Sequence, residues 1–70
     1  MSASVAVAAL TDARRALDAR WRTLRAGWDD AAAARFEEDV IRPLEADLKR
    51  AIAAAQELQA FSARSRKEHP

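Results

Sequence analysis

The sequence predicts an all-α fold: a single domain over residues 1–70, built as an antiparallel helical hairpin with a longer second helix. On both sides of the single glycine, Gly27, apolar residues recur every three or four positions, which is the period of a half-buried helix. Alanine, the strongest helix former, fills 19 of the 70 positions. One glycine between two such stretches indicates a hinge between two helices.

The first helix is expected over about residues 4–26. Ser4 is a fair N-cap, and Thr11–Asp12 is the alternative start if the Ala/Val stretch frays. Gly27 stands where the left-handed residue that ends a helix belongs. The apolar positions follow a heptad seam with one polar interruption at Arg14: Val7, Leu10, Leu17, Trp21, Leu24 and Trp28.

The turn is predicted at residues 27–29, and the second helix over about 30–66. Asp29 or Asp30 serves as the N-cap of that helix, since an acid also suits the positive end of a helix dipole. The apolar stripe of this helix is wider than a minimal seam. It consists of Phe36, Val40, Ile41, Leu44, Leu48, Ala51, Ile52, Ala55, Leu58 and Phe61.

Pro43 conflicts locally with the second helix. A proline inside a helix removes a backbone donor and crowds the carbonyl four residues earlier, here that of Asp39. Because no good N-cap, glycine or asparagine stands nearby, a kinked continuous helix is favoured over a break into three helices.

A hairpin of this size has a marginal core, because alanine adds little buried area. At about 1.5 Å per residue, the first helix folds back only to about residue 51 of the second, which leaves the rest of the apolar stripe uncovered. We therefore expect a protein partner, as a homodimer or as a heterodimer with a similar hairpin, in a four-helix bundle. The expected interface residues are Leu44, Leu48, Ile52, Ala55, Leu58 and Phe61.

The charge is unevenly spread along the chain. The formal net charge of +1 arises from +3 over residues 1–26, −3 over residues 27–50 and +1 over residues 51–70. Such a pattern indicates that the two halves face each other. Antiparallel folding is expected to set three arginines against three acids, namely Arg20, Arg22 and Arg25 against Glu37, Glu38 and Asp39.

The sequence offers no chemistry of an enzyme. It has no nucleophile paired with a base and no glycine-rich phosphate loop, so we expect no catalytic residue, no cofactor and no metal site. The lone histidine, His69, stands beside the terminus. Nucleic-acid and membrane binding are disfavoured, since acids interrupt the basic surface of the first helix. The arginines of that surface are Arg14, Arg15, Arg20, Arg22 and Arg25.

The residues around the hinge resemble a known motif. Trp28, Asp29 and Asp30, followed by Phe36 eight residues after the tryptophan, resemble the WXG family of early-secreted-antigen-like helical hairpins exported by type VII secretion systems. In that family a Trp-x-Gly turn joins two helices, and an aromatic residue about two turns later packs beside it. By this resemblance Trp28 is the turn tryptophan, Asp30 stands in the place of the family glycine, and Phe36 is the following aromatic residue. Together with the hinge glycine, Gly27, they form the predicted turn motif.

The resemblance implies a function as well as a fold. Hairpins of this family pair antiparallel into four-helix dimers and carry no cleavable signal, so the chain is expected to act as a dimeric substrate or as a companion of a larger effector. It is expected to be made in the cytoplasm and exported by a signal-independent route. The family's C-terminal export signal, an aromatic residue and an acid four residues later, is not found, because Ser65 stands four residues after Phe61.

Two other classes of function remain open. One is a cytoplasmic adaptor or antitoxin-like module whose second helix docks into a groove of its partner. The other is a small nucleic-acid-associated protein that uses the first helix. Export without a signal peptide would distinguish the secretion role from the adaptor. A salt-dependent gel shift would support the nucleic-acid-associated protein.

Overall fold

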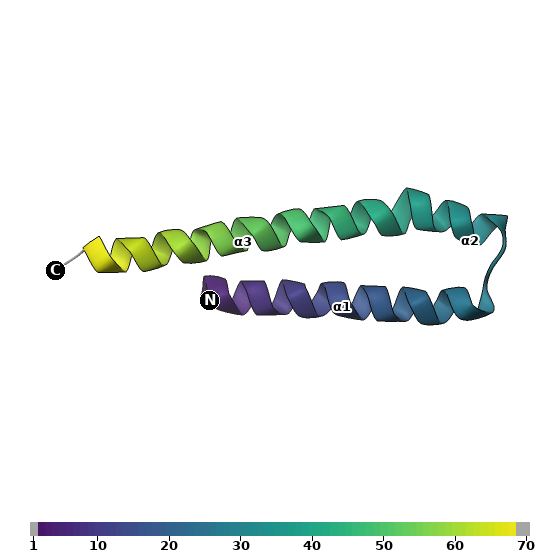
Figure 1. Ribbon diagram of the computed structural model, residues 1–70, viewed down its shortest axis with the longest axis horizontal. Coiled ribbons are helices and arrows are strands. Elements are labelled where there is room, and N and C mark those ends of the chain that lie inside the picture. Colours follow the sequence, from purple (N-terminus) through teal and green to yellow (C-terminus); the bar gives the residue numbers. More distant parts are fainter. Residues whose placement is uncertain (1, 69–70) are drawn as a thin grey trace.

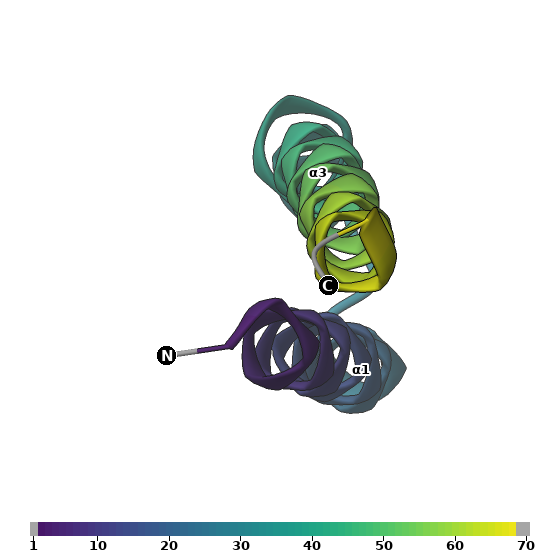
Figure 2. The ribbon, with the colours of Figure 1, turned by 90° about the vertical axis from the view of Figure 1, so that its left-hand side faces the viewer.

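The computed structural model describes residues 2–68 and confirms the predicted all-α hairpin. Two helical arms run antiparallel, joined by a short turn at one end, and the second arm extends past the N-terminus of the first (Figure 1, Figure 2). The elements are α1 (Ala3–Gly27), α2 (Ala31–Phe36), the π-helix η1 (Glu37–Ile41) and α3 (Arg42–Glu68).

Helix α1 begins earlier than either predicted start. Ser2, not Ser4, is the N-cap: its backbone is extended, and its side chain accepts a hydrogen bond from the Val5 backbone N–H at 3.3 Å. A serine in this position satisfies one of the free N–H groups of the first helical turn. The Ala/Val stretch is therefore helical from Ala3 onward.

The prediction of a left-handed Gly27 is wrong. Gly27 is the last residue of α1, and no glycine has a positive φ. The chain reverses direction instead through extended residues, with φ/ψ of −138°/95° at Trp28 and −124°/−177° at Asp30. The turn thus lies at residues 28–30, and Asp30 caps the second arm by accepting from the Ala33 N–H at 2.9 Å.

The second arm passes Pro43 without a break, because α2, η1 and α3 follow one another directly. A π turn precedes the proline, with the Arg42 N–H bonded to the Glu37 carbonyl five residues earlier. Proline in a regular helix crowds the carbonyl of the fourth preceding residue, and a wider turn at this point relieves that crowding. In place of the expected kink at Pro43, the second arm therefore contains one extra residue in the π turn before the proline.

The π turn also sets which residues face α1. Ala33 and Ile41 are buried and Glu37 is half-buried, although eight residues of regular helix make about 2.2 turns and would carry Ala33 off the face of Ile41. The extra residue of the π turn restores the alignment. Over the described residues, the buried apolar side chains are Trp21, Ala33 and Ile41.

The molecule is a rod rather than a globule. Its principal extents are 60 × 17 × 13 Å, and its radius of gyration is 16.8 Å. A compact domain of this length has a radius of gyration of about 11 Å. Two helices side by side cannot enclose a core, so most side chains retain contact with solvent.

Candidate interaction surface

The tip of the hairpin is closed by three aromatic rings. Trp21 lies with its ring centroid 5.4 Å from that of Phe36 and 6.1 Å from that of Trp28, and the Trp28–Phe36 distance is also 6.1 Å. These separations are typical of aromatic pairs that pack edge to face or tilted. Trp21 is 7% exposed, whereas Phe36 is 39% exposed. The structure thus brings the two predicted motif aromatics, Trp28 and Phe36, together against Trp21.

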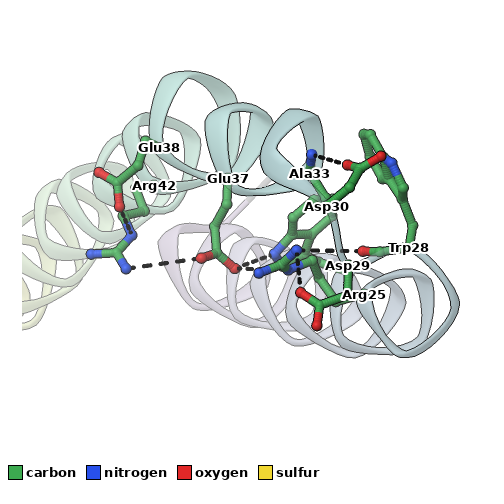
Figure 3. A network of polar contacts seen from close by, with 9 residues as sticks. Arg25, Trp28, Asp29, Asp30, Ala33, Glu37, Glu38 and Arg42 are labelled. Carbon is green, nitrogen blue, oxygen red and sulfur yellow. Dashed lines mark hydrogen bonds and ion pairs between the residues drawn. The ribbon is translucent and has the colours of Figure 1, made fainter.

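Glu37 connects the two arms beneath these rings. Its Oε1 accepts a hydrogen bond of 2.6 Å from the Trp21 indole Nε1–H. The same carboxylate lies 4.0 Å from Arg25 Nε and 3.9 Å from Arg42 Nη2 (Figure 3). The short indole bond satisfies a donor on a buried ring, which is the usual requirement for a buried tryptophan.

The turn is held by polar contacts of its own residues. Arg25 Nη1 lies 3.2 Å from an Asp29 carboxylate oxygen and donates to the Trp28 carbonyl at 3.4 Å (Figure 3). An arginine in the last turn suits the negative end of a helix dipole. Apart from the chain neighbours of Gly27 and the backbone of its own helix, no atom lies within 4 Å of the position a Cβ would take, so the turn does not depend on close approach at the glycine.

The expected charge pairing between the arms is reduced to one contact. Within residues 2–65, Arg25 is the arginine of α1 that pairs with the second arm, through Glu37. Arg22 instead pairs with Asp18 on its own helix at 2.5 Å, and Glu38 pairs with Arg42 at 3.0 Å. These exposed pairs along one helix contribute tenths of a kcal/mol, about 0.3 to 0.5 each.

The six predicted interface residues fall into two groups. Leu48, Ile52 and Ala55 are half-buried. The other three are well exposed, at 42%, 57% and 60% for Leu44, Leu58 and Phe61. Leu24, which was predicted on the apolar seam of the first helix, is also 51% exposed. It therefore does not belong to the face of α1 that packs on the second arm.

The expected length of the uncovered segment is wrong. The N-terminal residues Ser2, Ala3 and Ser4 line one shallow hollow together with Leu58 and Phe61, so α1 reaches well beyond residue 51. The difference arises because α1 is longer than predicted at both ends, from Ala3 to Gly27, and because the second arm begins one residue later, at Ala31. The π turn adds one further residue to the second arm. The contact at this open end is made by small side chains, which leave their large neighbours exposed.

The remaining chemistry of the described residues is sparse. They contain no cluster of three or more potential metal ligands, and none of the helices described is long and apolar enough to cross a membrane. His69 lies outside the described residues. Four of the five arginines of α1 are exposed, and the fifth, Arg25, is half-buried at the tip.

Sequence reasoning missed one buried residue of this arrangement, Ala33. It placed Ile41 on the apolar stripe and Glu37 opposite the arginines of the first helix, but it linked neither residue to Trp21. The sequence signal for this face is the four-residue spacing of Ala33, Glu37 and Ile41. A regular helix would not keep all three on one face, whereas a helix with a π turn does.

Searches against protein-family models, curated proteins and solved structures find no match to the chain. The resemblance to the WXG family therefore stays a prediction carried by the turn residues.

Proposed function

We propose that this chain is a non-catalytic interaction module, whose exposed helical faces pair with another helical hairpin in a four-helix bundle. The observation that carries the proposal is the imbalance of apolar side chains. Across the part of the chain that the structure describes, the buried apolar residues number three, against seven exposed large ones. The exposed set is Val5, Leu24, Phe36, Val40, Leu44, Leu58 and Phe61.

The surface area supports association. The accessible surface of the chain is 5496 Å². A compact monomer of 7.7 kDa exposes about 4,300 Å², so the hairpin carries an excess of about 1,200 Å². One partner in a standard protein–protein interface buries about 800 Å². The excess is large enough to supply one side of a stable interface.

The tip supports the more specific part of the proposal, a WXG-like role as substrate or companion of a larger exported effector. Trp28 and Phe36 pack beside the turn, where the resemblance implies that they lie. Asp30, which stands in the place of the family glycine, starts the second arm as an N-cap. An aspartate can therefore serve at this position without a left-handed backbone.

Association is tested by light scattering across a concentration series. The chain is expected to form a dimer, either alone or with a different hairpin on co-expression. Leu58→Asp is expected to abolish this association while leaving the helical content largely intact, since Leu58 is 57% exposed. Ala53→Asp is the matched control, because Ala53 is an exposed residue of the same helix that lies off the apolar stripe. A Leu58→Asp variant that still associates like the parent would contradict the proposed surface.

The secretion role needs a separate test. A tagged chain is expressed in a bacterium with a type VII system, and its amount in the medium is compared between the intact and the disabled system. Loss of export on disabling the system is the expected result. Equal amounts in both cultures would refute the role in secretion and leave the pairing module in place.

A further inference from the structure

One side of the second arm, next to the stripe that faces α1, carries a second apolar seam whose side chains stay exposed. Leu44, Ala51 and Leu58 are seven residues apart, and Ala54 and Phe61 each follow a seam position by three. This is the a/d pattern of a helix that packs on another helix. All five of these side chains are exposed. The charged residue at the remaining d position, Asp47, is paired with Arg50 on its own helix.

The charges of the second arm are divided between its two halves. From 31 to 47 there are five acids and two bases, a balance of −3, and from 48 to 68 there are five bases and two acids, a balance of +3. Two such arms placed parallel would set like charges together. Two arms placed antiparallel would set each acidic half against a basic half, which favours encounter and fixes orientation.

We infer that the occupant of this seam is a second copy of the chain, with α3 packed antiparallel on α3 of the partner about a two-fold axis near residue 53. This inference rests on the proposed pairing function and adds the identity, orientation and register of the partner. At the axis Ala51 meets Ala54 of the partner subunit, and small side chains there let the helices approach. Leu44 meets Phe61 of the partner subunit, once on each side of the axis. The same spacing sets Leu58 opposite Asp47 of the partner subunit, whose carboxylate is paired with Arg50 of its own helix.

The residues that flank the seam support the same register. Arg50 and Glu57 directly precede Ala51 and Leu58, and they lie about equally far from residue 53. In an antiparallel pair, flanking positions of the same kind meet, so Arg50 faces Glu57 of the partner subunit twice. In a parallel pair Arg50 and Glu57 would instead face the residues of the partner that directly follow Asp47, Ala54 and Phe61. Those residues are uncharged: Leu48, Ala55 and Ser62. Glu57 makes no ion pair within residues 2–65. Arg50 already pairs with Asp47 of its own helix, so in the dimer its guanidinium would lie between that carboxylate and Glu57 of the partner subunit.

Cross-linking tests the orientation, because the chain has no cysteine of its own. Single variants Ala51→Cys, Ser65→Cys and Ala46→Cys are treated with a short bis-maleimide. Ala51→Cys, beside the axis, is expected to give a covalent dimer. Ser65→Cys lies on the same seam, but its two copies are about 36 Å apart along an antiparallel pair and stay unlinked. Ala46→Cys, exposed on another face of α3, is the control.

Each other outcome overturns the inference. If Ala51→Cys and Ser65→Cys both cross-link, the pair is parallel. If light scattering shows a dimer but Ala51→Cys does not cross-link, another face is used. If the chain alone is monomeric and associates only with a different hairpin on co-expression, the proposed pairing function stands while the second copy is excluded. If it associates with neither, both proposals fail.

Charge reversal tests the register. Arg50→Glu and Glu57→Arg each create two like-charge contacts and are expected to weaken the dimer about tenfold. The double variant Arg50→Glu/Glu57→Arg is expected to recover part of this loss, because Asp47 still lacks its Arg50 partner. Circular dichroism of the three variants checks that helicity is unchanged. A double variant weaker than both single variants would refute the Arg50–Glu57 contact.

Discussion

The tip and the open end of the hairpin bring the same two arms together by different means. At the tip Trp21 is 7% exposed, lies against two further aromatic rings and donates to Glu37. At the open end Leu58 and Phe61 are 57% and 60% exposed, although residues of α1 lie beside them. The chain has large apolar side chains at both ends, so their number does not explain the difference.

The difference lies in the neighbours of these side chains. At the tip a three-residue turn holds three aromatic rings together, and large rings cover one another. At the open end α1 offers Ser2, Ala3 and Ser4, whose small side chains cannot cover a leucine or a phenylalanine. We therefore expect the tip to supply the stability of the single hairpin and the open end to supply surface for a partner.

Trp21→Ala tests this division with the largest expected effect. Removing a tryptophan that is 7% exposed should lower the free energy of unfolding by about 3 to 5 kcal/mol, since the variant loses apolar burial and leaves a cavity. Phe61→Ala is the matched variant at the open end and should lower it by less than about 1 kcal/mol at concentrations where the chain is monomeric. Urea unfolding followed by circular dichroism measures both. Equal losses would show that the two ends contribute alike.

Glu37→Ala tests the polar part of the tip. The substitution leaves the Trp21 indole N–H without its acceptor, which should cost about 1 to 3 kcal/mol of unfolding free energy. Glu38→Ala removes the neighbouring exposed carboxylate, whose pair with Arg42 contributes about 0.5 kcal/mol or less. The same urea titration compares the two variants. If Glu38→Ala proves as harmful as Glu37→Ala, the indole bond has no special role.

Asp30→Ala tests the start of the second arm. The variant removes the cap on the Ala33 N–H and should cost about 1 kcal/mol. Asp29→Ala is the control, because Asp29 is 84% exposed and makes a surface pair with Arg25. Thermal unfolding of both variants at one fixed concentration provides the measurement. A larger loss from Asp29→Ala would contradict the assignment of Asp30 as the N-cap.

Much of the hairpin could be predicted from the sequence because its signals are local. The three-to-four spacing of apolar residues, an aspartate before Ala31 and the aromatics around the turn each act within a few residues. The burial of Ala33 could not be predicted, because a π turn shifts Ala33 relative to Ile41 and periodicity assumes a regular helix. The prediction of how far α1 covers the second arm was also wrong, because small errors in the helix ends and in the turn add up with the extra residue of the π turn.

The backbone at Gly27 was the other error, and it allows the prediction with the smallest effect. A glycine after a helix is usually left-handed, but here the extended Trp28 reverses the chain and Gly27 stays helical. Since a Cβ at Gly27 would meet no atom within 4 Å apart from its chain neighbours and the backbone of its own helix, Gly27→Ala should raise the free energy of unfolding by about 0.5 kcal/mol through helix propensity. Ala26→Gly, one residue earlier in the same exposed turn, should lower it by a similar amount. Urea unfolding of the two variants separates the alternatives: a loss of stability in Gly27→Ala would mean that the turn needs a left-handed residue, and that the tip closes differently from the structure described.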